Sequence, residues 1–328
     1  MKKLISILLA FALFACIFTG CSNLHNSESK LSIVTTIFSG YDWINQIIGD
    51  KASNVEVTML LDSGVDLHSY QPTATDIIKI SECDMFIYVG GESDSWVDDA
   101  LNNAVNEDMV VINLLEVLGD DIVKKEEFVE GMQDDNHDDE DEHHDEEHEY
   151  AYDEHVWLSL NNAKLICKYI SDKLAEIDPD NKQTYAVNTE AYIGKLIALD
   201  NQYQTTVDSA PVKTLLFGDR FPFRYLVDDY GLEYYAAFSG CSAESEASFE
   251  TVAFLAKKID ELGLTTVLTI DGMNHRIAQT VIETTKSKNA KILSMNSMQS
   301  TTSADIENGV TYLSIMEANL DVLKNALK

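Results

Sequence analysis

Segments with strand composition alternate with segments of helical spacing along most of this chain. The first strands are predicted at 31–36, 55–61, 85–89 and 110–114. After Pro211 the alternation resumes, and strands are predicted at 214–218, 232–237, 266–270 and 291–295, with a final helix over 303–327. Strand, helix, strand in short alternation is typical of a parallel sheet covered by helices. We therefore predict an α/β fold in which two sheets form separately.

A long helical stretch lies between the two runs of strands, bracketed by Pro179 and Pro211. Its apolar and aromatic side chains are three, four or seven positions apart, as on one stripe of a helix: Tyr185, Tyr192, Leu196, Leu199 and Tyr203. A helix over 180–210 would be about 45 Å long. We predict Rossmann-like lobes at 31–179 and 211–328, joined by this one rigid helix.

The composition changes sharply over 134–149. These 16 residues comprise 11 acidic side chains, one asparagine and four histidines, namely His137, His143, His144 and His148. Without a hydrophobic side chain the segment cannot bury apolar surface, so we predict a surface loop. Imidazoles among carboxylates can capture metal weakly, although the alternative is a solvated charge run. The net charge of −33 and the lack of a basic patch argue against nucleic-acid binding.

The N-terminus has the pattern of an export signal. Met1-Lys2-Lys3 precedes an apolar run over 4–18 that is too short for a membrane-spanning helix. The run closes at Phe18-Thr19-Gly20-Cys21, which resembles the lipobox of bacterial lipoproteins. The resemblance implies a signal peptide over 1–20, lipidation of Cys21, a tether over 21–30, and a location on the outer face of the cytoplasmic membrane. The alternative is plain secretion.

Two histidines stand where a parallel sheet would place a ligand. His68 follows the predicted strand at 55–61 and precedes a helix, and ligands of parallel α/β sheets lie beyond the carboxyl ends of strands. His155 follows the acidic loop and precedes an apolar run. Imidazole suits zinc and other late first-row metals. Taken alone, a histidine such as His68 is more often a surface residue than a ligand, and the alternative for His155 is a loop histidine whose neighbours are merely packed.

The motifs taken together resemble a known family. They are His68-x-Tyr70-x-Pro72-x-x-x-Asp76, then Asp84 to Gly91 with Trp96, then His155-Val156-Trp157-Leu158 before a long helix. Their combination resembles the ZnuA-like, cluster A-I solute-binding lipoproteins of ABC importers for zinc or manganese. The resemblance spans nearly the whole chain after the signal. It implies a monomer that captures a divalent metal, Zn²⁺ first, between its lobes and delivers it to a permease with its ATPase.

The resemblance also implies metal ligands from the second lobe, where the chain departs from the family pattern. Arg220 stands where a third histidine is expected, and a guanidinium cannot ligate a cation. The acidic residue at a strand end corresponds to Asp271, and the last aspartate corresponds roughly to Asn296. We predict Asp271 and His275 as the further ligands, with helix-cap roles as the alternative. Three residues are further candidate metal ligands: Cys241, Glu244 and Asp219.

Three other functions remain open. The same fold could carry Mn²⁺ or Fe²⁺, which favour more oxygen ligands, or it could serve as a surface adhesin or scaffold with weak metal binding. A zinc hydrolase ranks last, because the sequence has no His-Glu-x-x-His, no Gly-x-Ser-x-Gly and no convincing nucleophile-base pair. We therefore predict a binding protein and not an enzyme.

Overall fold

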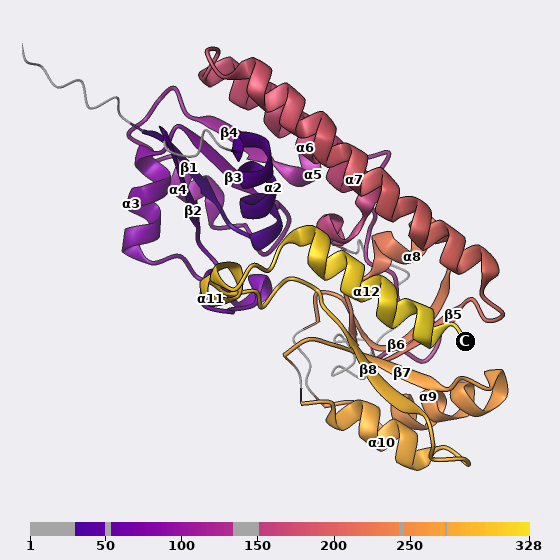
Figure 1. Ribbon diagram of the computed structural model, residues 1–328. Helices are drawn as coiled ribbons and strands as arrows, with labels where there is room; N and C mark the ends of the chain where they lie inside the picture. Colours follow the sequence, from indigo (N-terminus) through magenta and orange to yellow (C-terminus); the bar gives the residue numbers. More distant parts are fainter. Residues whose placement is uncertain (1–29, 50–53, 134–150, 243–245, 273) are drawn as a thin grey trace, which may run out of the picture. The chain divides into compact units, whose positions relative to one another are not determined.

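The structure is a computed structural model that describes residues 30–49, 54–133, 151–242, 246–272 and 274–328 (Figure 1). Cys21, Glu244 and the four histidines of the acidic loop lie outside the described residues, as do the predicted signal peptide and most of the tether. Residues 31–328 form one compact unit. As far as the structure describes them, all its helices are too short or too polar to span a lipid bilayer.

The first sheet is parallel and has the strand order β2-β1-β3-β4. Its strands are β1 (Leu31–Thr35), β2 (Val55–Met59), β3 (Met85–Tyr88) and β4 (Val110–Asn113). The helices of this part are α2 (Phe38–Ile48), α3 (Ala74–Glu82), α4 (Val97–Leu101), α5 (Leu114–Leu118) and α6 (Leu160–Ile177). The 3₁₀ turns η2 (Leu67–Ser69) and η3 (Val156–Leu158) follow β2 and precede α6 respectively.

The second sheet repeats this topology as β6-β5-β7-β8, again parallel. Its strands are β5 (Thr214–Phe221), β6 (Glu233–Ser239), β7 (Thr266–Ile270) and β8 (Lys291–Met295). Its helices are α8 (Arg224–Tyr230), α9 (Phe249–Leu262) and α10 (Arg276–Thr284). In both sheets the strand order reverses beside the first strand, and loops at the carboxyl ends of the strands diverge there to leave room for a ligand. The predicted α/β fold with two parallel sheets is confirmed.

The long helix predicted between the sheets is α7 (Lys182–Ser209), about 42 Å long at 1.5 Å per residue. Its buried stripe contains all five predicted side chains together with Thr189 and Val207. The helix packs on α2 and α6 at one end and on α8 and α12 (Tyr312–Ala326) at the other (Figure 1). Asn188 donates a hydrogen bond to the carbonyl of Ile47 at 2.9 Å, and the Tyr203 hydroxyl donates to the carbonyl of Met316 at 2.6 Å. The helix is therefore fastened to both lobes.

The prediction of a single final helix over 303–327 is wrong. The structure has α11 (Ser303–Glu307) and, after a break, α12. Gly309 lies in the break with φ +88°, a conformation that other residues rarely adopt. Thr311 then caps α12 by accepting the N–H of Ser314. The apolar spacing continues across the break, which is why periodicity alone does not detect it.

Candidate metal centre

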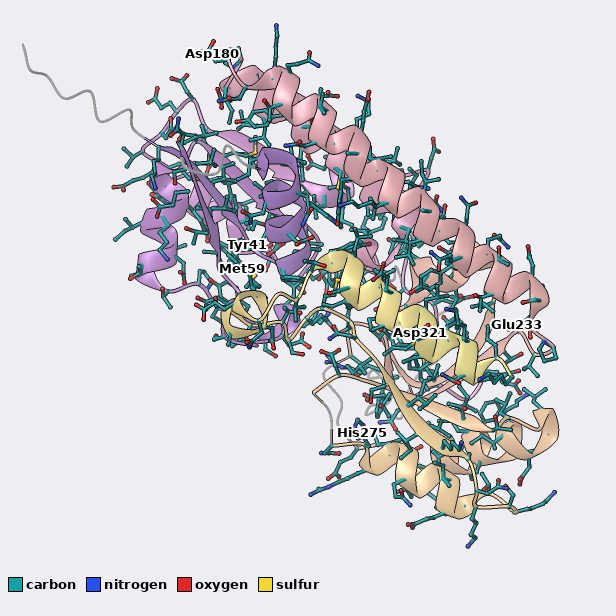
Figure 2. The ribbon with its side chains drawn as sticks, in the orientation of Figure 1. Tyr41, Met59, Asp180, Glu233, His275 and Asp321 are labelled. Carbon is teal, nitrogen blue, oxygen red and sulfur yellow. The ribbon has the colours of Figure 1, made fainter. Side chains whose placement is uncertain are left out.

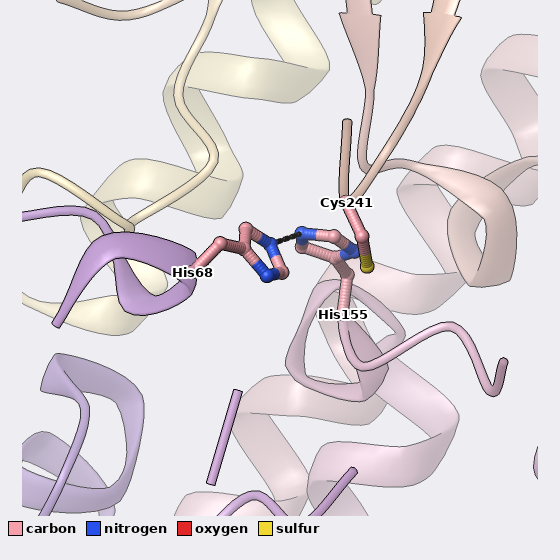
Figure 3. A group of neighbouring side chains, drawn as sticks. All are labelled: His68, His155 and Cys241. Carbon is pink, nitrogen blue, oxygen red and sulfur yellow. Dashed lines mark hydrogen bonds between the residues drawn. The ribbon is translucent and has the colours of Figure 1, made fainter. Parts of the chain in front are cut away.

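His68 and His155, which are 87 positions apart in the chain, meet at the carboxyl edge of the first sheet. Their Nε2 atoms are 3.1 Å apart (Figure 3). His68 lies in η2, the next element after β2, and His155 precedes η3 and is fully buried. Two nitrogens bound to one tetrahedral zinc ion are about 3.3 Å apart. The separation of these two imidazoles is therefore close to what a shared zinc ion requires.

The residues around His68 explain why its motif has this spacing. The Asp66 carboxylate accepts the backbone N–H of His68 at 3.0 Å and so caps η2. Four positions after Pro72, Asp76 forms a capping box with Thr73 at the start of α3, and the Tyr70 hydroxyl donates to the same Asp76 carboxylate at 3.1 Å. The turn that carries His68 is thus fixed at both ends.

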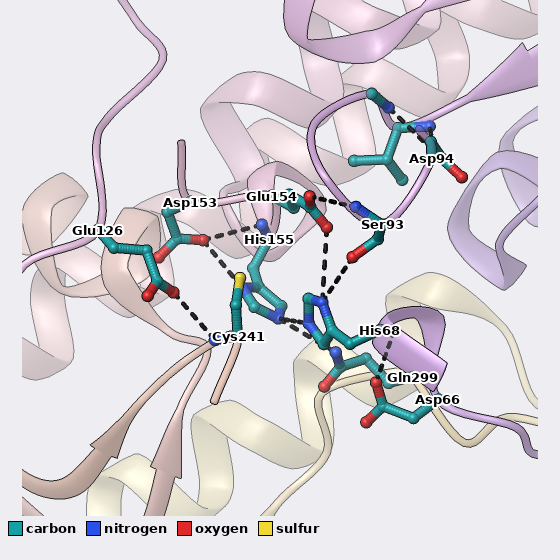
Figure 4. Close-up of polar contacts among 12 residues, drawn as sticks. Asp66, His68, Ser93, Asp94, Glu126, Asp153, Glu154, His155, Cys241 and Gln299 are labelled. Carbon is teal, nitrogen blue, oxygen red and sulfur yellow. Dashed lines mark hydrogen bonds and ion pairs between the residues drawn. The ribbon is translucent and has the colours of Figure 1, made fainter. Parts of the chain in front are cut away.

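A hydrogen-bond acceptor stands behind each imidazole. Asp153 Oδ1 is 2.9 Å from His155 Nδ1, and Ser93 Oγ is 2.7 Å from His68 Nδ1, with Glu154 Oε2 at 3.5 Å (Figure 4). A carboxylate only accepts, so these partners favour a proton on each Nδ1 and a lone pair on each Nε2. Two lone pairs that face each other need a proton or a cation between them. These acceptors therefore prepare both imidazoles for ligation.

The electrostatics of the two histidines differ. Burial, together with the nearby His155, lowers the pKa of His68 to about 3, so its imidazole is neutral and free to ligate. Burial also acts to lower the pKa of His155, but the charge and hydrogen bond of Asp153 outweigh it and raise this pKa above its ordinary value.

Cys241 completes a group of three donors. Its Sγ and one ring nitrogen of each histidine all lie within 4.8 Å of one another (Figure 3). The preceding residue, Gly240, lies so close to the His155 ring that a Cβ there would be 3.0 Å from Cε1 of the ring and 3.0 Å from the carbonyl of Phe221. The missing side chain lets the end of β6 approach the imidazole. Burial and the carboxylates of Glu126 and Asp153 raise the pKa of the thiol well above its ordinary value.

Gln299 is a fourth polar side chain in contact with this group, and the sequence analysis did not single it out. It is 7% exposed, and its amide Nε2 is 3.1 Å from His155 Nε2 (Figure 4). It lies in the loop after β8, so its place beyond the carboxyl end of a predicted strand was the signal that could have found it. For Asp153 and Glu154 the signal was their position directly before the candidate ligand His155.

Among the described residues, neither Asp271, His275 nor Asp219 belongs to the group of three donors. Asp271 Oδ1 accepts the backbone N–H of Ser297 at 2.7 Å, and its Oδ2 accepts the Ser300 hydroxyl at 2.5 Å. His275 lies at the start of α10 (Figure 2) with φ 55°, and it is not one of the three donors that lie together. The Asp219 carboxylate accepts the backbone N–H groups of Arg220 and Ile270. Asp271 therefore anchors the loop that carries Gln299.

Arg220, which stands in place of the expected histidine, links the loops that carry two of the donors. Its Nη2 is 2.7 Å from Asp66 Oδ2 in the first lobe, and its Nη1 donates to the carbonyl of Ser242 at 3.2 Å. Burial would raise the pKa of Asp66, but the Arg220 charge and hydrogen bond outweigh it and hold that pKa below its ordinary value. Asp66 is thus ionised and the link is an ion pair.

The chain has two parallel α/β lobes fastened by one long helix, and buried or half-buried cation donors lie at the strand ends of both sheets. These features define a two-lobe metal-binding protein of the solute-binding class. The family described as "ZnuA: Zinc-uptake complex component A periplasmic" matches residues 33–326. The chain belongs to this family, as the motifs predict, and the family is one of substrate-binding transport proteins and not of enzymes.

Named relatives and solved structures support this membership. The zinc-binding lipoprotein AdcA of Streptococcus pneumoniae (strain TIGR4) is 33% identical over 325 residues, which are 99% of this chain and 61% of AdcA. The high-affinity zinc uptake system protein ZnuA of Bacillus subtilis (strain 168) is 30% identical over 97% of this chain and 96% of its own. The chain thus spans about 61% of the length of AdcA but nearly all of the Bacillus protein.

The crystal structure of the Zn(II)-bound ZnuA-like domain of S. pneumoniae AdcA has a TM-score of 0.69 and 28% identity, with coverage of 91% of this chain and 99% of that domain. The metal-dependent lipoprotein YcdH of B. subtilis has a TM-score of 0.71 and 29% identity, with coverage of 91% and 99% respectively. These similarities agree with the observed arrangement of two parallel sheets.

Proposed function

We propose that this protein is an extracytoplasmic solute-binding lipoprotein that captures Zn²⁺ and delivers it to the permease of an ABC importer. Family membership supports the transport role, and the relatives named above are zinc-binding or zinc-uptake proteins. The observation that carries the proposal for this chain is the 3.1 Å separation of His68 Nε2 and His155 Nε2, with Cys241 Sγ beside them. Such a group has no evident role without a cation.

The donor types favour zinc. Two imidazoles and a thiol are borderline and soft ligands, which suit Zn²⁺ and disfavour Mn²⁺ and Mg²⁺, ions that prefer carboxylate and carbonyl oxygens. We therefore propose His68, His155 and Cys241 as ligands. Cys241 takes precedence over Asp271, because both carboxylate oxygens of Asp271 already accept hydrogen bonds from the loop after β8.

We further propose that Cys21 carries a lipid that anchors a monomer to the outer face of the bacterial cytoplasmic membrane, where it meets the permease and its ATPase. The signal-like N-terminus and the lipobox-like Phe18-Thr19-Gly20-Cys21 support this location. Metabolic labelling with a radioactive fatty acid tests it. The anchor requires label in the full chain and none in Cys21→Ala.

Zinc titration of the full chain, purified in detergent, tests the site. Loss of a residue that only holds a metal ligand in place weakens metal binding about 10- to 100-fold. His68→Ala and His155→Ala should each weaken zinc binding by more than this. His275→Ala is the matched control, because His275 lies outside the group of donors, and it should bind zinc like the parent. Unchanged affinity in both first variants would contradict the proposal. Competition between Zn²⁺ and Mn²⁺ then separates zinc uptake from a manganese protein of the same fold.

A further inference from the structure

The three donors that lie together in this site are two nitrogens and one sulfur. Cys241 Sγ and one ring nitrogen each of His68 and His155 all lie within 4.8 Å of one another. Two histidines and one cysteine around one ion are also the strong ligands of blue-copper sites, in which any further ligand is weak and distant. Zinc instead takes about four donors. A group of three donors of these types therefore suits copper as well as zinc.

Both imidazoles turn the same nitrogen toward a shared position. Asp153 Oδ1 lies 2.9 Å from His155 Nδ1 and Ser93 Oγ lies 2.7 Å from His68 Nδ1, so these oxygens stand behind the rings. The two Nε2 atoms are 3.1 Å apart. Two nitrogens about 2.0 Å from one ion in a trigonal arrangement would be about 3.5 Å apart. A small rotation of either ring reaches that spacing.

The loop that carries Cys241 is fastened on both sides of the sulfur. Glu126 Oε1 accepts the backbone N–H of Cys241 at 2.9 Å (Figure 4). Arg220 Nη1 donates to the carbonyl of the next residue, Ser242, at 3.2 Å. These contacts hold the backbone around the side chain, so the sulfur stays within reach of the imidazoles when no metal is bound.

We propose that His68, His155 and Cys241 also form a copper site, in which Cu²⁺ competes with Zn²⁺ for the same three donors. This inference rests on the ligands of the proposed function and adds a second cation to them. Binding breaks the S–H bond of Cys241, releases its proton to solvent and forms a copper–sulfur bond, and copper stays in the same oxidation state. For a given set of nitrogen, oxygen and sulfur donors, Cu²⁺ binds more tightly than Zn²⁺. Zinc capture by this protein therefore requires that copper be scarce around it.

The visible absorption spectrum tests the copper site directly. The full chain in detergent receives one equivalent of Cu²⁺ without oxygen, and the spectrum is recorded at once. We expect an intense sulfur-to-copper charge-transfer band that is lost in Cys241→Ser, because a hydroxyl supplies no sulfur. Cys167→Ala, at a fully buried cysteine of α6, is the matched control and should keep the band. The histidines and carboxylates of 134–149 can also bind Cu²⁺, but they supply no sulfur and produce no such band.

Displacement of zinc tests whether the two cations share the donors. The parent protein is loaded with one equivalent of Zn²⁺ and titrated with Cu²⁺, while a chromogenic indicator reports free zinc. The charge-transfer band and the released zinc should rise together and level off at one equivalent. A band that grows while zinc stays bound would place copper elsewhere and overturn the shared site.

The outcomes separate this proposal from the proposed function. Absence of the band in the parent, or its persistence in Cys241→Ser, would overturn the copper site. Zinc binding that still depends on His68 and His155 would then leave zinc capture intact. A parent that shows the copper band but binds no zinc would overturn the proposed function and the competition, and copper alone would remain as the ligand of the site. Thermal unfolding in the presence of a chelator verifies that each variant is folded.

Discussion

At the scale of single residues, Arg220 stands where a histidine ligand is expected, and it still contributes to the site. The guanidinium cannot ligate metal, but it joins Asp66, which caps the turn of His68, to the loop of Cys241. Its side chain is 12% exposed and that of Asp66 is 26% exposed, so solvent screens the pair less than a surface pair. Arg220 therefore positions two donors that come from different lobes.

We expect Arg220→Gln to weaken zinc binding about 10-fold, as for an outer-shell residue. Asp66→Asn should have a similar effect, and the double variant should lose little more than either single one, because the two residues act as one pair. Calorimetric titration of the four proteins measures this coupling. Fully additive losses would show that Arg220 and Asp66 act separately. Arg224→Gln, at an arginine that pairs with Glu127 and Asp228, is the control.

Asp94 makes a second prediction at this scale, on stability. It is 3% exposed and accepts the backbone N–H groups of Val89 and Gly90 at 2.9 and 3.0 Å. Burial, to which the charge of Glu154 adds, raises the pKa of Asp94 to about 7. Between the ordinary pKa near 4 and this value, the folded state holds a proton that the unfolded state has released. Stability therefore falls as pH rises through this window and is level above it.

Asp94→Asn should remove this pH dependence, because the amide has no proton to lose and its oxygen can still accept both N–H groups. In chelator, the variant should exceed the parent in free energy of unfolding at pH 8 by at most on the order of 4 kcal/mol, and the two should converge near pH 4. Urea unfolding at several pH values measures this difference. Parallel curves for the two proteins across that range would rule out Asp94 as the titrating group.

At the scale of elements, α7 carries a stripe of buried aromatic and aliphatic side chains and an exposed remainder. Gly194 lies within this helix, and a Cβ built there meets no atom within 4 Å. Glycine in a helix interior is less favourable than alanine because it loses more backbone freedom on folding. The position therefore offers a clean measure of how far α7 contributes to the stability of the protein.

We expect Gly194→Ala to stabilise the protein by about 0.5–1 kcal/mol. Gly240→Ala is the contrasting variant, because a Cβ at that position would lie 3.0 Å from the His155 ring. It should destabilise the protein and weaken zinc binding. Chemical unfolding in chelator compares the two. A stability unchanged by Gly194→Ala would mean that α7 unfolds outside the main cooperative transition.

At the scale of the whole molecule, the contacts of α7 predict how much residues 31–328 rearrange on binding metal. One hydrophobic core contains side chains from both sheets, including Ile33 of β1 and Leu268 of β7, together with the buried stripe of α7. Hydrogen bonds from Asn188 and Tyr203 fasten the same helix to α2 and α12. A wide hinge motion would break this packing, so metal binding should rearrange loops more than lobes.

Small-angle scattering of the protein with chelator and with one equivalent of zinc tests this expectation. The radius of gyration should agree within experimental error in the two states, because the shared core stays intact. Amide hydrogen exchange should slow in the loops around His68, Cys241 and Gln299 and stay unchanged in α7. A clear decrease of the radius of gyration on zinc binding would instead indicate a closing hinge of the kind found in periplasmic binding proteins.

The positions of strands and of the long helix were predictable because each depends on a local pattern. Runs of apolar and β-branched residues without charge, such as Thr266–Ile270, indicate strands buried on both faces. The stripe from Tyr185 to Tyr203 indicates one helix. The break between α11 and α12 escaped this reasoning, since Asn308 and Gly309 interrupt the helix without interrupting the apolar spacing.

The candidate site was predictable only in part. Local sequence around His68 and His155 identifies them as candidate ligands at strand ends, and the family resemblance links them to one metal. The choice among Asp271, His275, Cys241 and Gln299 depends on which loops meet in space. Those loops follow different strands of the second sheet, and the strand order of that sheet and the contacts of its loops with the histidines bring Cys241 and Gln299 to the imidazoles. Local periodicity therefore determined the elements of this protein, whereas contacts between residues far apart in the chain decided which donors face one another.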